Sequence, residues 1–250
     1  MKPVFHPRSI VLAAVVALVS ACAAPEVTQL INDPYEEQNR AVHEFNKQVD
    51  TAILKPLTGA AGGRNGEPGV FLTTVGNFAG NIDLPRMVVN DVLQANPEDA
   101  AHNFTRFLIN STFGIAGLFD PATAWGLPVR SSDFGETLHV WGVSEGTYVE
   151  LPFLGPSTSR DTVGTVVDFV LNPVGYVVPS PESYAVPAAT VVSRLTARAK
   201  YGDSVDEVLY GSADSYAQTR LLYLQNRRFQ LGQTVPEADF DPFDLDTEGF

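Results

Sequence analysis

One short stretch of the sequence has the spacing of a hydrolase nucleophile. Residues 142–146 (GVSEG) match G-x-S-x-G, in which a serine hydroxyl attacks a carbonyl after a histidine takes its proton. Such a serine needs a strand before it, a helix after it and a histidine later in the chain. Here the preceding residues favour a helix, residues 147–152 favour an extended chain, and all four histidines precede Ser144. The glycines therefore indicate turns, and we expect no enzymatic activity.

The other residues that could do chemistry form no set that would hold a metal or a cofactor. A single cysteine and scattered histidines lack the spacing of a zinc site, and no glycine-rich loop of the phosphate-binding type is found. Arg160 and Asp161, followed by Asp168, have two interpretations. They either line a passage through the protein as a polar group, or they cap a helix and form ion pairs.

The single cysteine, Cys22, is placed for lipid attachment. Residues 1–21 contain two basic residues, an apolar run over 10–19 and small residues at the end, which is typical of a secretory signal peptide. Residues 19–22 (VSAC) are similar to the bacterial lipobox, whose cysteine takes a thioether-linked diacylglycerol. A plain cleavage site is the alternative, but it would leave an exported thiol without a disulfide partner. Because Ala23 follows, and not Asp, we expect anchoring to the outer membrane.

The charge of the mature chain excludes nucleic acid as a partner. Removal of residues 1–21 takes away two basic residues and leaves 14 basic against 29 acidic residues, a net charge of about −15. Nucleic acid and anionic lipid headgroups would repel such a chain. Attachment to a membrane must therefore come from acyl chains and from apolar surface.

The mature chain of about 229 residues has no internal repeat, linker or charge block, so it is predicted to form one domain. We expect a lipidated tether over residues 22–32, a helical domain over 33–231 and an acidic tail over 232–250. Acidic tails are usually disordered. The regular spacing of aromatic residues in this tail is also compatible with a docking peptide.

Cap residues, prolines and apolar residues at helical spacing predict helices throughout the domain. In the first half the predicted helices run from Asp33-Pro34 to Lys55-Pro56, over 70–79 with a break at Gly80-Asn81, from Leu84-Pro85, and from Asn96-Pro97. In the second half a helix capped by residues 157–159 and apolar nearly all round precedes an irregular segment over 172–187 and helices over 188–199, 204–209 and 214–231. Arg220, Arg227 and Arg228 are assigned to the C-terminal dipole of the last helix. Since no alternation of period two is sustained, the fold class is predicted as all-α, compact and multi-helix, with irregular Gly/Pro-rich connections.

A charge-free segment of thirteen residues, Phe107–Phe119, lies between Arg106 and Asp120. A membrane-spanning helix needs about 20 apolar residues, so this segment is too short to span. It is also more apolar than a surface loop requires. We predict a helical hairpin that dips into one leaflet, with its polar backbone facing protein or a water-lined passage. A buried helix followed by a loop is the alternative, because short apolar runs are ambiguous.

Five segments in a fixed order carry a resemblance to a known family. They are Asp33–Asp50 (DPYEEQNRAVHEFNKQVD) with Lys55-Pro56, Val75–Gln94 (VGNFAGNIDLPRMVVNDVLQ), Asn103–Ala122 (NFTRFLINSTFGIAGLFDPA), Phe134–Asp161 (FGETLHVWGVSEGTYVELPFLGPSTSRD) and Tyr216–Arg227 (YAQTRLLYLQNR). Together they resemble the MlaA (VacJ) family of outer-membrane lipoproteins over about residues 33–230.

The resemblance implies a ring-like helical domain in the inner leaflet of the outer membrane, facing the periplasm beside trimeric porins. It implies that mislocalised phospholipids leave the outer leaflet through a central passage to a periplasmic MlaC-like carrier and the inner-membrane MlaFEDB complex, which maintains lipid asymmetry without covalent chemistry. By the same resemblance, the hairpin and passage lie within residues 107–156 and include Phe113, Gly114, Ile115, Gly117, Leu118, Phe119, Trp125, Phe134, Trp141 and Gly142. A non-catalytic lipoprotein scaffold bound to porins is the alternative.

Overall fold

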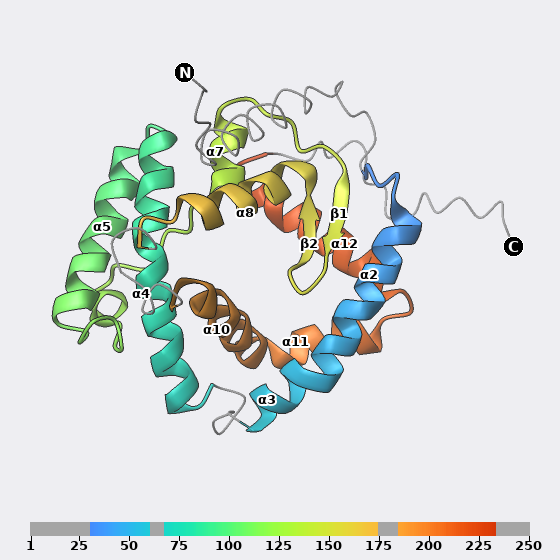
Figure 1. The fold of residues 1–250 in the computed structure, drawn as a ribbon, viewed down its shortest axis with the longest axis horizontal. Coiled ribbons are helices and arrows are strands. Elements are labelled where there is room, and N and C mark those ends of the chain that lie inside the picture. Colours follow the sequence, from blue (N-terminus) through green and yellow to red (C-terminus); the bar gives the residue numbers. More distant parts are fainter. Residues whose placement is uncertain (1–30, 61–67, 175–184, 234–250) are drawn as a thin grey trace, which may run out of the picture.

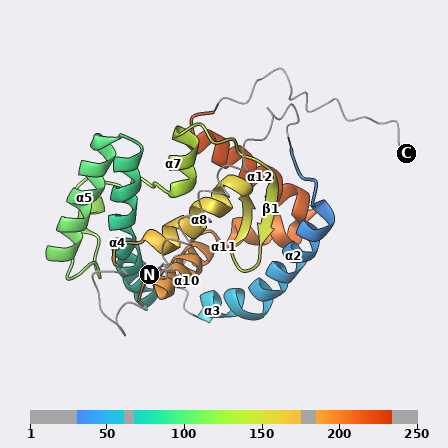
Figure 2. The same cartoon turned by 45° about the horizontal axis from the view of Figure 1, so that its top comes forward.

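The structure is a computed structural model that describes residues 31–60, 68–174 and 185–233. The signal peptide, Cys22, most of the tether and the tail beyond residue 233 lie outside these ranges, so what was expected of them stays a prediction. The described elements are arranged as a ring (Figure 1). A pair of long helices, α4 and α5, forms one side of the ring, and α2 and α12 lie on the opposite side (Figure 2).

The fold is predominantly helical, as predicted. Its helices and helical turns are α2 (Glu36–Val49), the π-helical turn η1 (Asp50–Leu54), α3 (Lys55–Ala60), α4 (Val70–Leu93), α5 (Pro97–Thr112), α6 (Pro121–Ala124), α7 (Phe134–Val140), α8 (Ser159–Leu171), α10 (Ala185–Lys200), α11 (Gly202–Asp206), the π-helical turn η4 (Glu207–Gly211) and α12 (Ser215–Gln230). The strands of the described residues are β1 (Tyr148–Leu151) and β2 (Gly155–Thr158). They pair antiparallel, with Tyr148 opposite Thr158, and β1 falls in the segment that the sequence predicted as extended.

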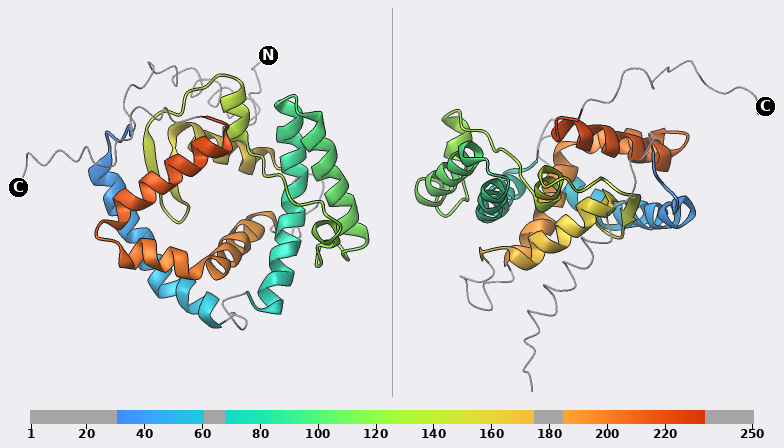
Figure 3. Two further views of the ribbon diagram at one scale, coloured as in Figure 1. Left: turned by 180° about the vertical axis from the view of Figure 1, so that it is seen from behind. Right: turned by 90° about the horizontal axis from the view of Figure 1, so that it is seen from above.

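Contacts between neighbouring elements close the ring. α4 packs on α7, α7 on α8, and α8 on the β1–β2 hairpin. β1 packs on α2, which continues through η1 into α3, and α3 packs on α10, which returns to α4. α5 packs on the outer side of α4, and α12 packs on β2 and η4. The same closed arrangement is seen from behind (Figure 3).

Capping side chains set several helix starts where the sequence predicted them. The side chains of Asn96, Thr158 and Asp214 each accept a hydrogen bond from the backbone amide three residues later, at the starts of α5, α8 and α12. These caps satisfy amides that have no partner inside the helix. The predictions succeeded here because a cap is a local interaction.

The capping prediction at Asp33 was wrong. α2 begins at Glu36 without a side-chain cap. The Asp33 carboxylate instead accepts hydrogen bonds from Asn39 and from Tyr216 and Arg220 of α12. Asp33 therefore joins the two ends of the domain and is not available to the first turn of α2.

The predicted break between the second and third helices does not exist, because α4 runs without interruption through Gly80-Asn81 and through Pro85. Packing explains its continuity, since most helical stability in proteins comes from tertiary contacts. A Cβ at Gly76 would lie 2.7 Å from the hydroxyl oxygen of Thr196, so this glycine allows α10 to pack closely. Asn81 is buried and donates a 3.0 Å hydrogen bond to Ser111 of α5.

The first helix was predicted to end at Lys55-Pro56, but the helical path continues to Ala60. Pro56 has no amide hydrogen to donate to the preceding turn, and the helical path passes through it directly after a π-helical turn. The π-helical turn before it contains Asp50, which is buried and accepts hydrogen bonds of 2.7 and 3.1 Å from Arg198 of α10. The turn is thus tied to the neighbouring helix of the ring.

The interior of the ring wall is more polar than that of an ordinary domain. Among the described residues, 20 polar or charged side chains are buried against 11 hydrophobic ones. The hydrophobic clusters are small, and their buried members are Phe134, Leu138 and Val167 in one and Tyr148, Tyr216 and Leu224 in the other. By contrast, 28 large hydrophobic residues of the described ranges are exposed. Hydrogen bonds and ion pairs hold the wall, and much apolar surface is exposed.

Candidate functional site

The charge-free segment ends in a compact turn between α5 and α6. Ile115, Ala116 and Gly117 are consecutive residues in the left-handed region, with φ of 53°, 56° and 90°. A Cβ at Gly117 would lie 2.5 Å from the Asn81 side chain, and one at Gly114 would lie 2.4 Å from two backbone oxygens. Glycine is therefore required at both positions.

The backbone of this turn satisfies its own hydrogen bonds. Ala116, Gly117 and Phe119 donate backbone bonds of 3.0, 2.8 and 2.9 Å to carbonyls of the same segment. A backbone that is irregular yet internally bonded is the kind that a low-dielectric environment tolerates. The chain turns back here from α5 toward α6, and the entry of this hairpin into a leaflet stays a prediction.

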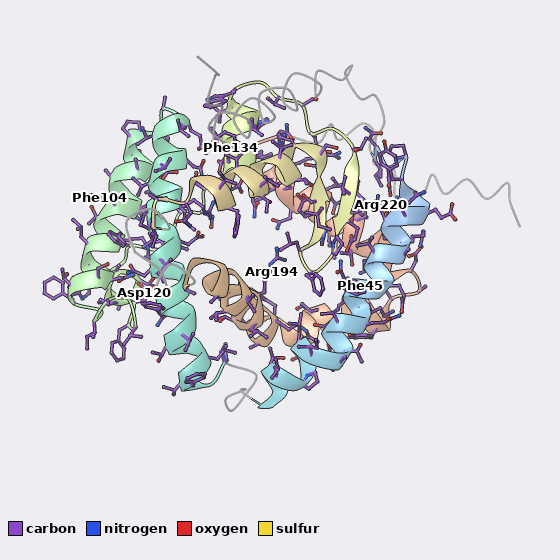
Figure 4. The ribbon with its side chains drawn as sticks, viewed as in Figure 1. Phe45, Phe104, Asp120, Phe134, Arg194 and Arg220 are labelled. Atoms are coloured by element: carbon purple, nitrogen blue, oxygen red, sulfur yellow. The ribbon has the colours of Figure 1, made fainter. Side chains whose placement is uncertain are left out.

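Apolar side chains cover the outer surface of the turn. We call this surface the apolar tip, and it consists of Phe113, Ile115, Leu118, Phe119 and Trp125. Phe113 is 70% exposed and Trp125 is 59% exposed, although their rings pack edge to face with centroids 5.5 Å apart. The apolar surface continues along α5 through Phe104 and Leu108, and the Phe104 side chain points away from the ring (Figure 4). Contiguous exposed apolar surface of this kind marks a protein or membrane contact.

The three other residues predicted for the hairpin and passage lie elsewhere, in α7 and at its C-terminal end, and Figure 4 shows Phe134 there. Phe134 is buried in a core cluster and packs edge to face on Trp141, with centroids 5.6 Å apart. Trp141 is exposed, and its indole nitrogen donates a 3.1 Å hydrogen bond to the Leu93 carbonyl. Gly142, with φ of 86°, ends α7. The structure therefore does not bring the ten predicted residues together in one place.

Arg160 and Asp161 lie inside the wall of the ring. Arg160 is 1% exposed and donates from Nε to Asp161 over 3.3 Å. Asp161 also accepts bonds of 3.0 and 3.1 Å from Arg227 and 2.7 Å from Tyr223, both on α12. Burial would raise the pKa of Asp161, but the hydrogen bonds from Arg227 and Tyr223 and the charges of Arg227 and Arg160 together lower it. This placement agrees with the ion-pair interpretation.

Arg227 is more than a cation at a helix end, which corrects its assignment from sequence. Besides Asp161, it holds Asp133 through bonds of 2.7 and 2.9 Å. Since Asp133 caps α7 and Asp161 lies in the first turn of α8, one buried guanidinium joins three helices. Arg228 and Arg220 likewise pair with Glu145 and with Asp33.

Asp168 joins α8 to α4 and α7. It accepts hydrogen bonds from Asn90 (2.8 Å) and the Phe134 amide (3.0 Å), and it forms a 2.9 Å ion pair with Arg86. A cavity of about 10 Å³ lies beside it, lined by Arg86, Val89, Asn90, Leu93, Phe134, Val167 and Asp168. Such a volume holds about one water molecule and not a lipid.

The centre of the ring contains a cation that sequence reasoning missed. In Figure 4 the Arg194 side chain extends from α10 into the centre, toward the β1–β2 hairpin. Its Nη1 donates a 2.7 Å hydrogen bond to the Leu154 carbonyl in the hairpin turn. Arg194 is exposed, yet enough protein surrounds it that burial lowers the pKa of its guanidinium. The only hint in the sequence is that α10 contains no acidic residue in a chain with 29 of them.

The structure supports the prediction that Ser144 is not a nucleophile, since helix α7 precedes it and strand β1 follows. A different serine does approach a histidine and an acid. His43 lies 3.1 Å from the Ser215 hydroxyl and 3.4 Å from Glu150. Asp214 caps the first turn of α12 at the same point, so the nearby Ala217 amide donates to its carboxylate and not to a reacting oxyanion. These contacts therefore hold α12 against α2 and β1.

The described residues include no group of histidine, cysteine or acidic side chains that could hold a metal ion. Within the same ranges, no helix combines the length and apolarity that a bilayer crossing requires.

Comparisons with known proteins place the chain in a family. The model of the family described as MlaA lipoprotein matches residues 31–230. The "Intermembrane phospholipid transport system lipoprotein MlaA" of Haemophilus influenzae is 33% identical over 239 residues, which cover 91% of this chain and 92% of the relative. The protein of the same description from Escherichia coli is 33% identical over 217 residues, with coverages of 85% and 84%.

A solved structure and a further relative agree with these matches. An uncharacterized protein of Rickettsia felis is 38% identical over 191 residues, covering 76% of this chain and 74% of the relative. The structure, described as "Structural basis for maintenance of bacterial outer membrane lipid asymmetry", matches with a TM-score of 0.67 and 32% identity. It covers 80% of this chain and 98% of that chain. The chain therefore belongs to the MlaA lipoprotein family.

Proposed function

We propose that this protein is an outer-membrane lipoprotein that removes mislocalised phospholipids from the outer leaflet and passes them through its ring toward the periplasm. Membership of the MlaA family supports intermembrane phospholipid transport as the activity. Transport of this kind moves an intact lipid and requires no bond to be made or broken. The family is one of transport lipoproteins and not of known enzymes.

The observation that carries the proposal is the distribution of apolar side chains. The buried positions are mostly polar, whereas the apolar tip and the outer side of α5 expose large hydrophobic residues. In water such a surface favours aggregation, whereas in a leaflet it is solvated by acyl chains. Helix α8, which the sequence showed to be apolar nearly all round, also exposes Val166 and Phe169. Since no helix of the described residues could span, the ring would lie within one leaflet, its inner-leaflet position secured by acyl chains on Cys22.

The proposed path of the lipid runs through the centre of the ring of helices. A phospholipid that crosses must keep its headgroup near polar groups and its acyl chains near apolar ones, because desolvating either without compensation is costly. Residues of α10 and of the β1–β2 turn, with Arg194 between them, provide polar groups at the centre. The apolar tip and the exposed Trp141 at the end of α7 provide apolar surface.

The partners follow from the family resemblance. We propose trimeric porins as neighbours in the membrane, a periplasmic MlaC-like carrier as the recipient of lipid and an MlaFEDB complex in the inner membrane as the later acceptor. A porin-bound scaffold without transport activity is the alternative function. It shares the membrane anchor and the apolar surface but makes no use of the ring.

Deletion and complementation separate the two functions. We expect deletion of the gene to raise the phospholipid content of the outer leaflet, measured as lipid A acylation and as detergent sensitivity. The wild-type gene should restore both, and a Cys22→Ala variant should not, because its product would lack the acyl anchor. A scaffold would leave outer-leaflet phospholipid unchanged after deletion. Membrane association of Cys22→Ala at the wild-type level would reject the anchor.

A further inference from the structure

Arg194 differs from the other arginines of the described residues in having no acidic partner. A carboxylate oxygen lies within 4 Å of Arg40, Arg86, Arg106, Arg130, Arg160, Arg198, Arg220, Arg227 and Arg228. In residues 31–60, 68–174 and 185–233, Arg194 has no such partner. Acidic residues outnumber basic ones by 29 to 16 in the sequence, so an arginine with no partner among the described acidic residues is unusual and can bind an anion from outside.

The side chain of Arg194 is bonded to a turn that is itself held in place. Its Nη1 bonds to the Leu154 carbonyl (2.7 Å), and the turn that carries Leu154 is itself fixed by α2. The side-chain nitrogen of Asn46 on α2 donates to the Leu151 carbonyl (3.0 Å), and its side-chain oxygen accepts from the Phe153 backbone amide (2.7 Å). Arginine has five N–H donors, and the Leu154 contact uses one of them. The remaining donors stay in reach of a ligand in the centre of the ring.

The surroundings of Arg194 favour an amphipathic anion over a free one. Phe153, in the same hairpin turn, is 68% exposed and packs edge to face on Phe45. Val191, one helical turn before Arg194 on α10, is also exposed. A charge next to exposed apolar side chains suits a ligand that has a phosphate at one end and hydrocarbon at the other. A small inorganic anion would gain nothing from the apolar part.

We propose that Arg194 binds the phosphodiester of a glycerophospholipid as the lipid crosses the ring. The planar guanidinium matches two phosphate oxygens at once, and a charged hydrogen bond of this kind is stronger than a neutral one. The proposal rests on the transport function inferred above and adds the group that selects the headgroup end of the lipid. Lipids without a phosphate, such as diacylglycerol, would lack this interaction.

The direct test is lipid binding by the full-length lipoprotein purified in detergent. Arg194→Gln removes the charge and keeps an amide that can still donate to Leu154. Arg194→Lys keeps the charge but lacks the planar set of N–H donors that can bind two phosphate oxygens at once. Lys200→Gln is the matched control, because Lys200 lies at the end of the same helix, is exposed and has its ammonium nitrogen 5.2 Å from the centre of the Tyr201 ring. Titration with dihexanoylphosphatidylglycerol, followed by ³¹P NMR, measures the affinity.

We expect Arg194→Gln to weaken binding of the short-chain lipid about ten-fold, Arg194→Lys to weaken it less, and Lys200→Gln to leave it unchanged. Dihexanoylglycerol should bind equally to all four proteins. Inorganic phosphate should compete only at much higher concentration. Wild-type affinity in a folded Arg194→Gln protein would overturn the proposal. Competition by inorganic phosphate as effective as by the lipid would also overturn it, because the site would then serve free anions.

Complementation of the deletion strain distinguishes failure of this proposal from failure of the transport function. If the wild-type gene does not lower outer-leaflet phospholipid, the transport function is wrong. If the wild-type gene does so and Arg194→Gln performs equally in cells and in titrations, only the role of Arg194 is wrong. Should Arg194→Gln fail to fold, the comparison of Arg194→Lys with wild type decides. Loss of the planar guanidinium alone should weaken binding of the phospholipid and leave binding of dihexanoylglycerol unchanged.

Discussion

Arg106 and Asp120, the two charges that bound the charge-free segment, pair with each other across 3.1 Å. The Arg106 side chain is 5% exposed and that of Asp120 is 27% exposed. Arg106 also donates to the Leu127 carbonyl, and Asp120 accepts from Asn110 and caps α6. The pair therefore closes the base of the apolar tip. It holds the two ends of the thirteen-residue uncharged segment together.

We predict that Asp120→Asn destabilises the domain by about 2–3 kcal/mol, because it leaves the buried Arg106 without a counter-charge. Burial would raise the pKa of Asp120, but its hydrogen bonds with Thr123 and Asn110 and the charge of Arg106 lower it. A carboxyl group whose folded pKa is lowered contributes stability above its unfolded pKa and loses that contribution as the pH falls. The difference between wild type and Asp120→Asn in urea unfolding should therefore be full at pH 7 and shrink in acid.

Glu98→Gln is the control for this experiment. Glu98 pairs with Arg130 over 2.9 Å, but its side chain is 81% exposed. Exposed pairs contribute about 0–1 kcal/mol, so this variant should unfold close to wild type. Equal stability of Asp120→Asn and Glu98→Gln would show that the Arg106–Asp120 pair does not stabilise the base of the apolar tip.

The second prediction concerns insertion of the tip into lipid. Ile115→Arg should leave folding intact, because Ile115 is 61% exposed and already adopts its left-handed conformation without glycine. An arginine in hydrocarbon costs about 2–3 kcal/mol, so binding of the domain to phospholipid vesicles should weaken by at least ten-fold. Outer-leaflet phospholipid in cells should rise.

Gln218→Arg adds the same charge to an exposed position of α12 and should change neither vesicle binding nor lipid asymmetry. Gly117→Arg is a poor substitute for Ile115→Arg, because any side chain at Gly117 would collide with Asn81 and disturb the fold. Unchanged vesicle binding by a folded Ile115→Arg protein would mean that the tip does not enter lipid.

Structural features that depend on local interactions, such as helix starts, were predicted from the sequence. The cap at Asn96 and the start of the last helix at Asp214 were predicted, because each depends on neighbours within a few residues. The continuity of α4 was not visible, since its glycines are tolerated through packing on α5 and α10.

Contacts between residues that are far apart in the sequence were not predicted. Arg227 contacts Asp161 and Asp133, which are 66 and 94 residues away. Arg194 meets Leu154 across the ring, 40 residues away in sequence. Neither spacing has a recognisable pattern, so sequence reasoning assigned Arg227 to a helix end and gave Arg194 no role. The polar centre of the ring could be located only from the folded arrangement.

The third prediction is a pH dependence that originates at Glu136. Burial, with the nearby charge of Asp133, raises the pKa of Glu136 from its usual 4.5 to about 7. A raised folded pKa contributes stability below the unfolded value, and this contribution is lost as the pH rises through the folded value. The free energy of unfolding of wild type relative to Glu136→Gln should therefore fall by about 1–2 kcal/mol between pH 5 and pH 8, allowing for partial exposure.

His139 lies three residues away, and its pKa is lowered by burial and by the charges of Arg160 and Arg227. Its contribution has the opposite sign, since stability from a lowered pKa is lost as the pH falls. The comparison of wild type with Glu136→Gln at each pH removes this contribution, because both proteins contain His139. Parallel pH profiles of the two proteins would reject the prediction.

The last prediction uses two glycines that differ in their surroundings. A Cβ at Gly164 of α8 would lie 2.3 Å from the Gly135 amide nitrogen of α7, so Gly164→Ala must push the two helix backbones apart and should cost about 2–3 kcal/mol. A Cβ at Gly80 of α4 would meet nothing within 4 Å, and Gly80→Ala should stabilise the domain by about 0.5–1 kcal/mol through helix propensity. Because α7 and α8 form one side of the ring, their separation should also lower lipid transport in cells, whereas Gly80→Ala should leave transport unchanged. Thermal unfolding of the two variants, with complementation of the deletion strain, tests whether the contact between α7 and α8 keeps the ring closed. A stable, active Gly164→Ala protein would show that the ring does not depend on it.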